Sequence, residues 1–174
     1  VMTWDGPYDE RMTRYFQMLN RPPLVSISDS QAKLAPGNLN FIGTVYNGLP
    51  MGHYPFSGKA GEYLLFVGRI DPEKGVHHAM DVALALGRKL IIAAKADVEV
   101  PSIKRYFKKE IEPRLKAHPE QLQWIGEVDE DERNRLMAGA LCFLHPVTWP
   151  EPFGLTLIES MACGTPVVAM GLGA

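Results

Sequence analysis

Residues 63–94, YLLFVGRIDPEKGVHHAMDVALALGRKLIIAA, contain the pattern that decides the fold. Tyr63–Val67 is apolar without a break, which is typical of a strand buried on both faces of a sheet. The following segment predicts a helix that stops at Gly87, because its apolar residues recur at helical spacing. Residues 89–94 form a second apolar run and predict the next strand. The residues expected on the buried side of the helix are Val76, Met80, Ala83 and Leu86.

The same alternation of strand and helix continues to the end of the chain. It predicts an α/β fold with a Rossmann-like parallel sheet and helices on both faces. Such sheets bind ligands at the carboxyl ends of their strands. Asp129 with Glu132 three residues later predicts a capped helix start, and Pro113 should bend or break the helix around it. The further strands are expected at 122–125, 141–144 and 166–170, and the helices at 102–118, at 129–140 and in a segment ending at Gly164.

The first sixty residues lack this alternation. Their pattern predicts a helix at 9–19 and short strands at 24–28 and 43–46. Residues 50–61 carry glycine and proline with little periodicity, so they are interpreted as an interdomain linker. The chain is therefore expected to open inside one sheet, at 1–49, and to continue into another from residue 62.

Composition limits the kinds of partner. The 174 residues contain 46% hydrophobic and 22% charged residues, enough for a core in a domain that stays in solution. The formal net charge of −2 argues against nucleic acid as a partner. We find no apolar run of transmembrane length and no signal peptide, although peripheral contact with a membrane stays possible. Cys142 and Cys163 lie in apolar runs and are interpreted as reduced core residues of a cytoplasmic protein.

The loop after the first strand of the repeating pattern, residues 68–75, places Arg69 and Lys74 at a carboxyl end. It is not a Walker A loop, because its glycine spacing differs. A guanidinium and an ammonium suit the diffuse negative charge of a diphosphate. Taken alone, the loop slightly favours the alternative of a solvated turn in which Arg69 pairs with Asp71 or Glu73.

A second candidate lies at residues 151–168, EPFGLTLIESMACGTPVV. Phe153–Thr156 is expected to form the first turn of a helix, whose free N–H groups can bind an anion. Gly154 would let a ligand approach the backbone closely. Glu151 and Glu159 would flank that turn, and a carboxylate can accept two hydroxyl protons from a vicinal diol. The alternative is a polar helix whose acids complement the helix dipole.

Other polar residues are weaker candidates. Lys95 ends the second strand and would add a cation to the same edge, although such lysines are usually only exposed. Asp129–Asp131 has the D-x-D pattern that holds a divalent ion in some transferases, but helix capping explains it more simply. No metal site is therefore predicted.

Taken together, these motifs resemble the retaining glycosyltransferases of family 4, which have the two-domain GT-B fold. The resemblance implies that 1–49 is the tail of the acceptor domain, 50–61 the linker, and 62–174 a donor domain that is incomplete at its C-terminus. It also implies that this piece alone transfers little sugar. The family's glycine-rich loop is missing, and Asp5 stands where the family often has histidine. The segments that carry the resemblance are 68–75, 151–159 and 161–169.

The resemblance implies a role for each candidate residue. Arg69 and Lys74 would bind the donor diphosphate and stabilise it as it leaves, and Glu151 would meet hydroxyls of the transferred hexose. Glu159 would hold the ribose, and Val128 would lie beside the base. The backbone contacts to hexose and phosphate would come from Phe153, Gly154, Leu155 and Thr156.

The expected function is transfer of a sugar from a UDP-, GDP- or ADP-linked donor to an acceptor, with retention of configuration. The acceptor could be a saccharide, a lipid or a small molecule, and neither cofactor nor metal is expected. Three alternatives stay open on the sequence: a GT-B sugar phosphorylase, a nucleotide-sugar epimerase, and a non-catalytic nucleotide-binding module.

Overall fold

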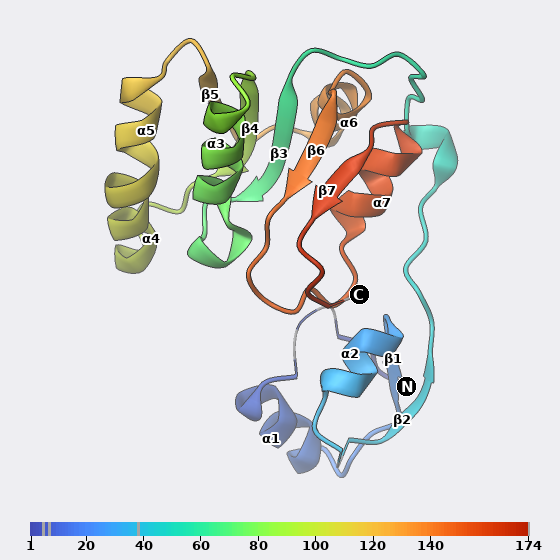
Figure 1. Cartoon of the computed structure of the whole chain (residues 1–174). Helices are drawn as coiled ribbons and strands as arrows, with labels where there is room; N and C mark the ends of the chain where they lie inside the picture. Colours follow the sequence, from blue (N-terminus) through green and yellow to red (C-terminus); the bar gives the residue numbers. More distant parts are fainter. Residues whose placement is uncertain (5, 7, 38, 174) are drawn as a thin grey trace. The chain divides into compact units, whose positions relative to one another are not determined.

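The computed structural model describes residues 1–4, 6, 8–37 and 39–173 (Figure 1). Their contacts divide them into two compact units. Unit 1 comprises the described residues of 1–49, 149–155 and 171–174, and unit 2 comprises 50–148 and 156–170. Whether these parts act as acceptor and donor domains stays a prediction. Asp5, which the resemblance singles out, lies outside the described residues.

Unit 2 is built on a five-stranded sheet in which every neighbouring pair of strands is parallel. The chain adds strands on one side of β3 and then on the other, so the topological switch point lies between β3 and β6. The predicted α/β fold with a parallel sheet is confirmed, and the switch point is where such sheets bind ligands. In spatial order the strands are β5 (Leu122–Gly126), β4 (Leu90–Lys95), β3 (Leu64–Arg69), β6 (Cys142–His145) and β7 (Val167–Ala169).

Helices cover both faces of this sheet (Figure 1). Leu64 and Phe66 are buried in one apolar cluster with Met80 of α3, whereas Leu65, next along the strand, points to the opposite face. Leu86, expected on the buried side, is 62% exposed because α3 ends at Ala85. The helices are α3 (Val76–Ala85), α4 (Pro101–Tyr106), α5 (Glu112–Ala117), α6 (Glu130–Ala138) and α7 (Leu155–Ala162).

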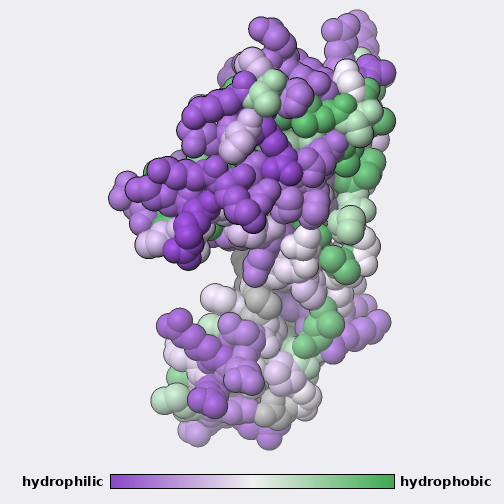
Figure 2. All heavy atoms as spheres, turned by 60° about the vertical axis from the view of Figure 1, so that its left-hand side comes forward, coloured by the Kyte–Doolittle hydropathy of each residue, from purple (hydrophilic) through white to green (hydrophobic). Residues whose placement is uncertain are grey.

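The single helix expected at 102–118 is interrupted. A π-helical turn, Phe107–Ile111, lies between α4 and α5, and Pro113 follows in the first turn of α5. Proline has no N–H to donate to the carbonyl four residues earlier, and its ring clashes with that carbonyl, so the helix widens before it. Figure 2 shows that the face carrying α4 and α5 is largely hydrophilic, as expected for an outer layer.

Unit 1 contains a parallel pair of strands, β1 (Leu24–Ser26) and β2 (Phe41–Thr44), with a single bridge from Met2 to Leu24. Helix α1 (Glu10–Met18) was expected, and the Asp9 carboxylate caps it by accepting the N–H of Met12 at 2.8 Å. The small hydrophobic core of unit 1 contains Tyr8, Phe16, Leu24 and Leu39.

Helix α2 (Asp29–Leu34) was not predicted, because residues 24–28 were interpreted as strand to the end. The strand stops at Ser26. Ser28 instead caps α2, since its hydroxyl accepts the N–H of Gln31 at 2.9 Å. A serine with glutamine three residues later was a signal for this helix start. Among the described residues, no helix has both the length and the apolar character needed to cross a membrane.

Candidate functional site at the carboxyl edge of the sheet

The loops that follow β3 and β6 meet beside the switch point. The Asp71 carboxylate accepts the N–H of Glu73 at 3.0 Å and caps a short 3₁₀ turn, Pro72–Lys74. The carbonyl of Glu73 then accepts the N–H of Thr148 from the second loop at 2.9 Å. Gly75 has a left-handed backbone (φ 70°), and a Cβ added there would lie 2.0 Å from the carbonyl oxygen of Pro146. Only glycine allows so close an approach of the two loops.

Arg69 and Lys95 form the cationic part of this edge. They are in-register partners at the ends of β3 and β4, so their side chains leave the same face of the sheet. The Lys95 ammonium lies 3.5 Å from the Asp97 carboxylate, and both side chains are about half exposed. These residues line a hollow of about 260 Å³. Within the described part of the chain, no ion pair joins Arg69 to Asp71 or Glu73, so the solvated-turn alternative lacks the pairing it required.

The motif around Gly154 is divided between the two units. Glu151 and Phe153 belong to unit 1, whereas Thr156 and Glu159 belong to unit 2. Helix α7 begins at Leu155, so Phe153 lies before the helix and not in its first turn as expected. Gly154 adopts a left-handed conformation (φ 81°) immediately before the helix. This conformation strains any other residue type, which explains the glycine at the helix start.

Within unit 1, the residues before α7 are partly buried. The backbone N–H of Glu151 donates to the carbonyl of Leu172 at 3.2 Å. The ring of Phe153 packs against that of Tyr46, with centroids 6.1 Å apart. Leu155, at the start of α7, is 41% exposed.

Glu159 is the most buried of the candidate carboxylates, with 7% of its surface exposed. Its Oε1 lies 3.2 Å from a guanidinium nitrogen of Arg133 and accepts a hydrogen bond from the Tyr54 hydroxyl at 3.4 Å. Its Oε2 is buried and has no hydrogen-bond partner among the described residues. A buried carboxylate oxygen without a donor is costly, so a ligand hydroxyl that donates to it would be favoured.

Sequence reasoning missed Arg133 and Tyr54. They lie on α6 and on the segment that was interpreted as a linker, far from Glu159 in the sequence. No local pattern of residues could have revealed the contact. Only folding brings the three side chains together.

Val128, expected beside the base, is half-buried in the segment between β5 and α6. The next residue, Asp129, accepts the N–H of Glu132 at 2.8 Å, so its predicted capping role is confirmed. Trp124 donates its indole N–H to the carbonyl of Ala94 at 2.8 Å and so ties β5 to the end of β4. No group of three or more metal-ligating side chains is found in the residues that the structure covers.

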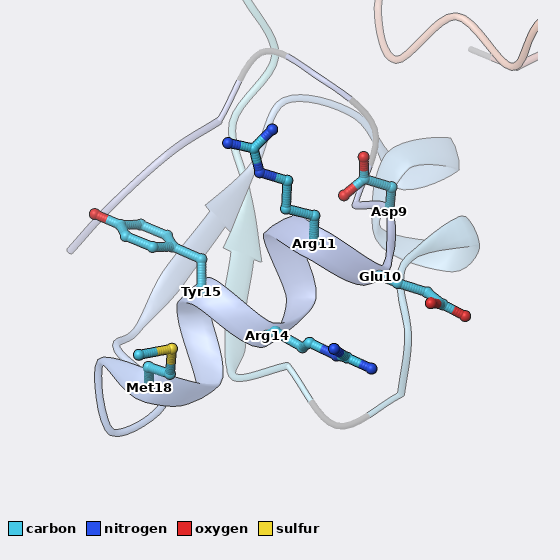
Figure 3. Close-up of a pocket in the computed structure, with 6 residues that line it drawn as sticks. All are labelled: Asp9, Glu10, Arg11, Arg14, Tyr15 and Met18. Carbon is cyan, nitrogen blue, oxygen red and sulfur yellow. The ribbon is translucent and has the colours of Figure 1, made fainter.

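Another hollow runs along α1 in unit 1 (Figure 3). All the side chains that line it are exposed, and none is a buried polar group that would await a ligand. It therefore supports no assignment. Its lining residues are Asp9, Glu10, Arg11, Arg14, Tyr15 and Met18.

A parallel sheet with cations at its carboxyl edge and a buried acid on the adjoining helix forms a Rossmann-like domain. Its fold matches that of GT-B glycosyltransferase structures. Residues 56–173 match the family Glycosyl transferases group 1, and the chain belongs to this family. The predicted resemblance to group 1 glycosyltransferases is thereby confirmed.

Two curated relatives illustrate the range of the family. The chain is 32% identical over 135 residues to a phosphatidyl-myo-inositol mannosyltransferase of Propionibacterium freudenreichii subsp. shermanii. The match covers 74% of this chain and 32% of the relative. It is 30% identical over 157 residues to a glycogen synthase of Mycobacterium tuberculosis, covering 85% and 36%. The chain thus spans about one third of the length of these relatives.

Solved structures share the fold. AviGT4, a glycosyltransferase involved in avilamycin A biosynthesis, is 26% identical with a TM-score of 0.70, covering 86% of this chain and 45% of that one. Sucrose-phosphate synthase from Thermosynechococcus elongatus gives a TM-score of 0.80 at 18% identity, covering 98% and 50%. Anabaena HepE in complex with UDP-glucose gives 0.76 at 20% identity, covering 98% and 53%. At these last two identities the likeness concerns the fold alone.

Proposed function

We propose that this protein transfers a sugar from a nucleotide-diphosphate sugar to an acceptor hydroxyl, with retention of configuration at the anomeric carbon. The observation that carries the proposal is Glu159, whose buried Oε2 lacks a donor within the described residues. A ribose hydroxyl supplies such a donor. Membership of the group 1 family and the UDP-glucose complex of HepE support a nucleotide sugar as the ligand.

The reaction breaks the bond between the anomeric carbon and the diphosphate, so negative charge grows on the departing oxygens. In this proposal Arg69, Lys74 and the free N–H groups at the start of α7 stabilise that charge. Because more of this charge is present in the transition state than in the bound donor, these groups accelerate the reaction more than they tighten binding of the donor. A divalent ion is not required when two cations carry out this neutralisation.

The remaining candidate residues would orient the donor. Glu151 would accept hydroxyls of the transferred sugar, and Val128 would contact the base. The acceptor oxygen forms the new glycosidic bond on the face of the sugar that the diphosphate leaves, and the hydroxyl proton passes to the departing diphosphate. Its chemical class, whether saccharide, lipid or small molecule, is left open in the proposal. The backbone contacts would come from Phe153, Gly154, Leu155 and Thr156, with Lys95 adding charge at the edge of the diphosphate site.

The test is Lys74→Ala in the full-length protein, with turnover of UDP-, GDP- and ADP-sugars as the readout. Loss of a group that stabilises transition-state charge should lower turnover about 10²- to 10³-fold. Lys89→Ala is the matched control, because Lys89 is an exposed lysine at the opposite end of β4. Unchanged turnover in Lys74→Ala would contradict the proposal.

The products of the same reactions separate the related activities. The anomeric configuration of the product, measured by NMR, tests retention. A reaction that proceeds only with inorganic phosphate as the sugar acceptor would instead identify a phosphorylase.

A further inference from the structure

Glu159 is held by a closed ring of contacts that begins and ends on consecutive residues. The Asn134 amide donates to the carbonyl of His53 at 3.2 Å, and its oxygen accepts from the Arg133 Nε at 3.4 Å. The Arg133 guanidinium lies 3.2 Å from Glu159 Oε1, which also accepts from the hydroxyl of Tyr54 at 3.4 Å. Asn134 is 2% exposed, and all the residues of the ring belong to unit 2.

The ring assigns the two carboxylate oxygens to different roles. Both protein donors, Arg133 and Tyr54, contact Oε1, and Oε2 has no hydrogen-bond partner among the described residues. Burial and the neighbouring Glu159 carboxylate raise the pKa of Tyr54, so its hydroxyl is protonated and donates at neutral pH. The Glu130 carboxylate, whose side chain is 60% exposed, also lies 3.8 Å from the Arg133 guanidinium.

Tyr54 belongs to the segment 50–61, which the sequence presented as a linker. In the structure the segment is part of unit 2 and packs beside the end of α7: the N–H of Ser57 donates to the carbonyl of Cys163 at 3.0 Å. A Cβ added to Gly164 would lie 2.3 Å from the Ser57 carbonyl oxygen, so glycine permits this close contact. Tyr54 itself is 9% exposed. The segment therefore contributes a fixed side chain to the surroundings of Glu159.

We propose that Tyr54 and Arg133 are positioning residues that hold Glu159 by Oε1 and reserve Oε2 for a ribose hydroxyl of the donor. This inference rests on the proposed function, in which Glu159 binds ribose. Preset ligand-binding groups lose less freedom when the ligand arrives, which is why supporting contacts of this kind strengthen binding. Oε2 is shielded from solvent in this structure. A ribose hydroxyl would reach it once a neighbouring side chain rotates, a change that is common where ligands bind.

The test compares nucleotides that differ only in their ribose hydroxyls. Calorimetry on the full-length protein would give the Kd of UDP, GDP and ADP, and of the 2′,3′-dideoxy form of whichever binds. For the wild type, the dideoxy form should bind about tenfold more weakly, the effect of one lost hydrogen bond to a charged group. In Tyr54→Phe, which keeps the ring, this discrimination should fall about three- to tenfold, with the dideoxy affinity unchanged.

Tyr63→Phe is the matched control, because the Tyr63 hydroxyl also donates one hydrogen bond within unit 2, to the carbonyl of Leu136 at 2.8 Å. It should keep the discrimination of the wild type. Arg133→Lys keeps the charge but removes the planar guanidinium, and it should reduce the discrimination as Tyr54→Phe does.

The outcomes separate the inference from the function on which it rests. Wild-type protein that binds both forms equally, or neither, overturns the ribose role of Glu159 and the inference with it. Wild-type discrimination that survives intact in Tyr54→Phe and Arg133→Lys overturns the inference alone. A fall in Tyr63→Phe as large as in Tyr54→Phe also overturns it, because the effect would then reflect general loss of packing.

Discussion

Gly75→Ala tests whether the contact between the two loops at the switch point supports the fold. Gly75 has φ 70°, and an added Cβ would lie 2.0 Å from the carbonyl oxygen of Pro146. Real Cβ atoms essentially never approach closer than 3.0 Å, so one of the two backbones must move by at least 3.0 − 2.0 = 1.0 Å. The movement would separate Glu73 from Thr148, which the same loops join at 2.9 Å.

The expected cost has two parts. The left-handed conformation costs an alanine about 1–2 kcal/mol. Overpacking a tight site costs about 1–3 kcal/mol more. Gly75→Ala should therefore lower the free energy of unfolding by about 2–5 kcal/mol.

Gly87→Ala isolates the first part, because Gly87 has a similar φ of 61° and nothing within 4 Å of an added Cβ. It should cost about 1–2 kcal/mol, measured like Gly75→Ala by equilibrium urea unfolding. The difference between the two variants measures the contact with Pro146. If Gly75→Ala destabilises the protein no more than Gly87→Ala, the loops are not locked together and the argument is refuted.

Two further predictions concern buried polar groups. Thr165→Val should destabilise unit 2 by about 1–2 kcal/mol in urea unfolding, because the buried Thr165 hydroxyl donates to the carbonyl of Met137. The control Thr148→Val, at an exposed threonine, should cost under about 0.5 kcal/mol. Equal costs for the two variants would contradict the reasoning. Burial and the neighbouring His78 lower the pKa of His77 in the folded state. The unfolded chain then binds the proton more readily, so the free energy of unfolding should fall as pH drops below about 6.5 and towards the lowered pKa. His77→Gln should flatten that slope across pH 5–7, and a slope identical to that of the wild type would show that another group titrates.

Local signals predicted the sheet well. Tyr63–Val67 and residues 89–94 are apolar over a strand's length, and the observed strands differ from them by one or two residues at each end. Asp129 was identified as a cap from its own short sequence context, and the structure confirms it. Such features depend on interactions between residues close in the sequence, so the sequence displays them directly.

The exact course and ends of the helices were predicted less well, because alternative backbone hydrogen bonds compete there. Pro113 was expected to bend a helix, but the π-helical turn at 107–111 depends on how the freed carbonyl finds a new partner. Leu86 shares the spacing of the buried residues of α3, yet it is exposed because the helix ends one residue before it. Periodicity specifies a face, and the helix end decides how far that face extends.

By itself the sequence determined the succession of strands and helices, the parallel sheet, and the family through its short motifs. The periodicity of hydrophobic residues and the capping of helices depend on residues a few positions apart, so both can be identified in the sequence. Only the tertiary structure decided that Arg133 and Tyr54 surround Glu159 and leave one of its oxygens without a donor. That arrangement is set by which helix packs beside which, and the packing depends on the shape of the whole core, which no local pattern encodes.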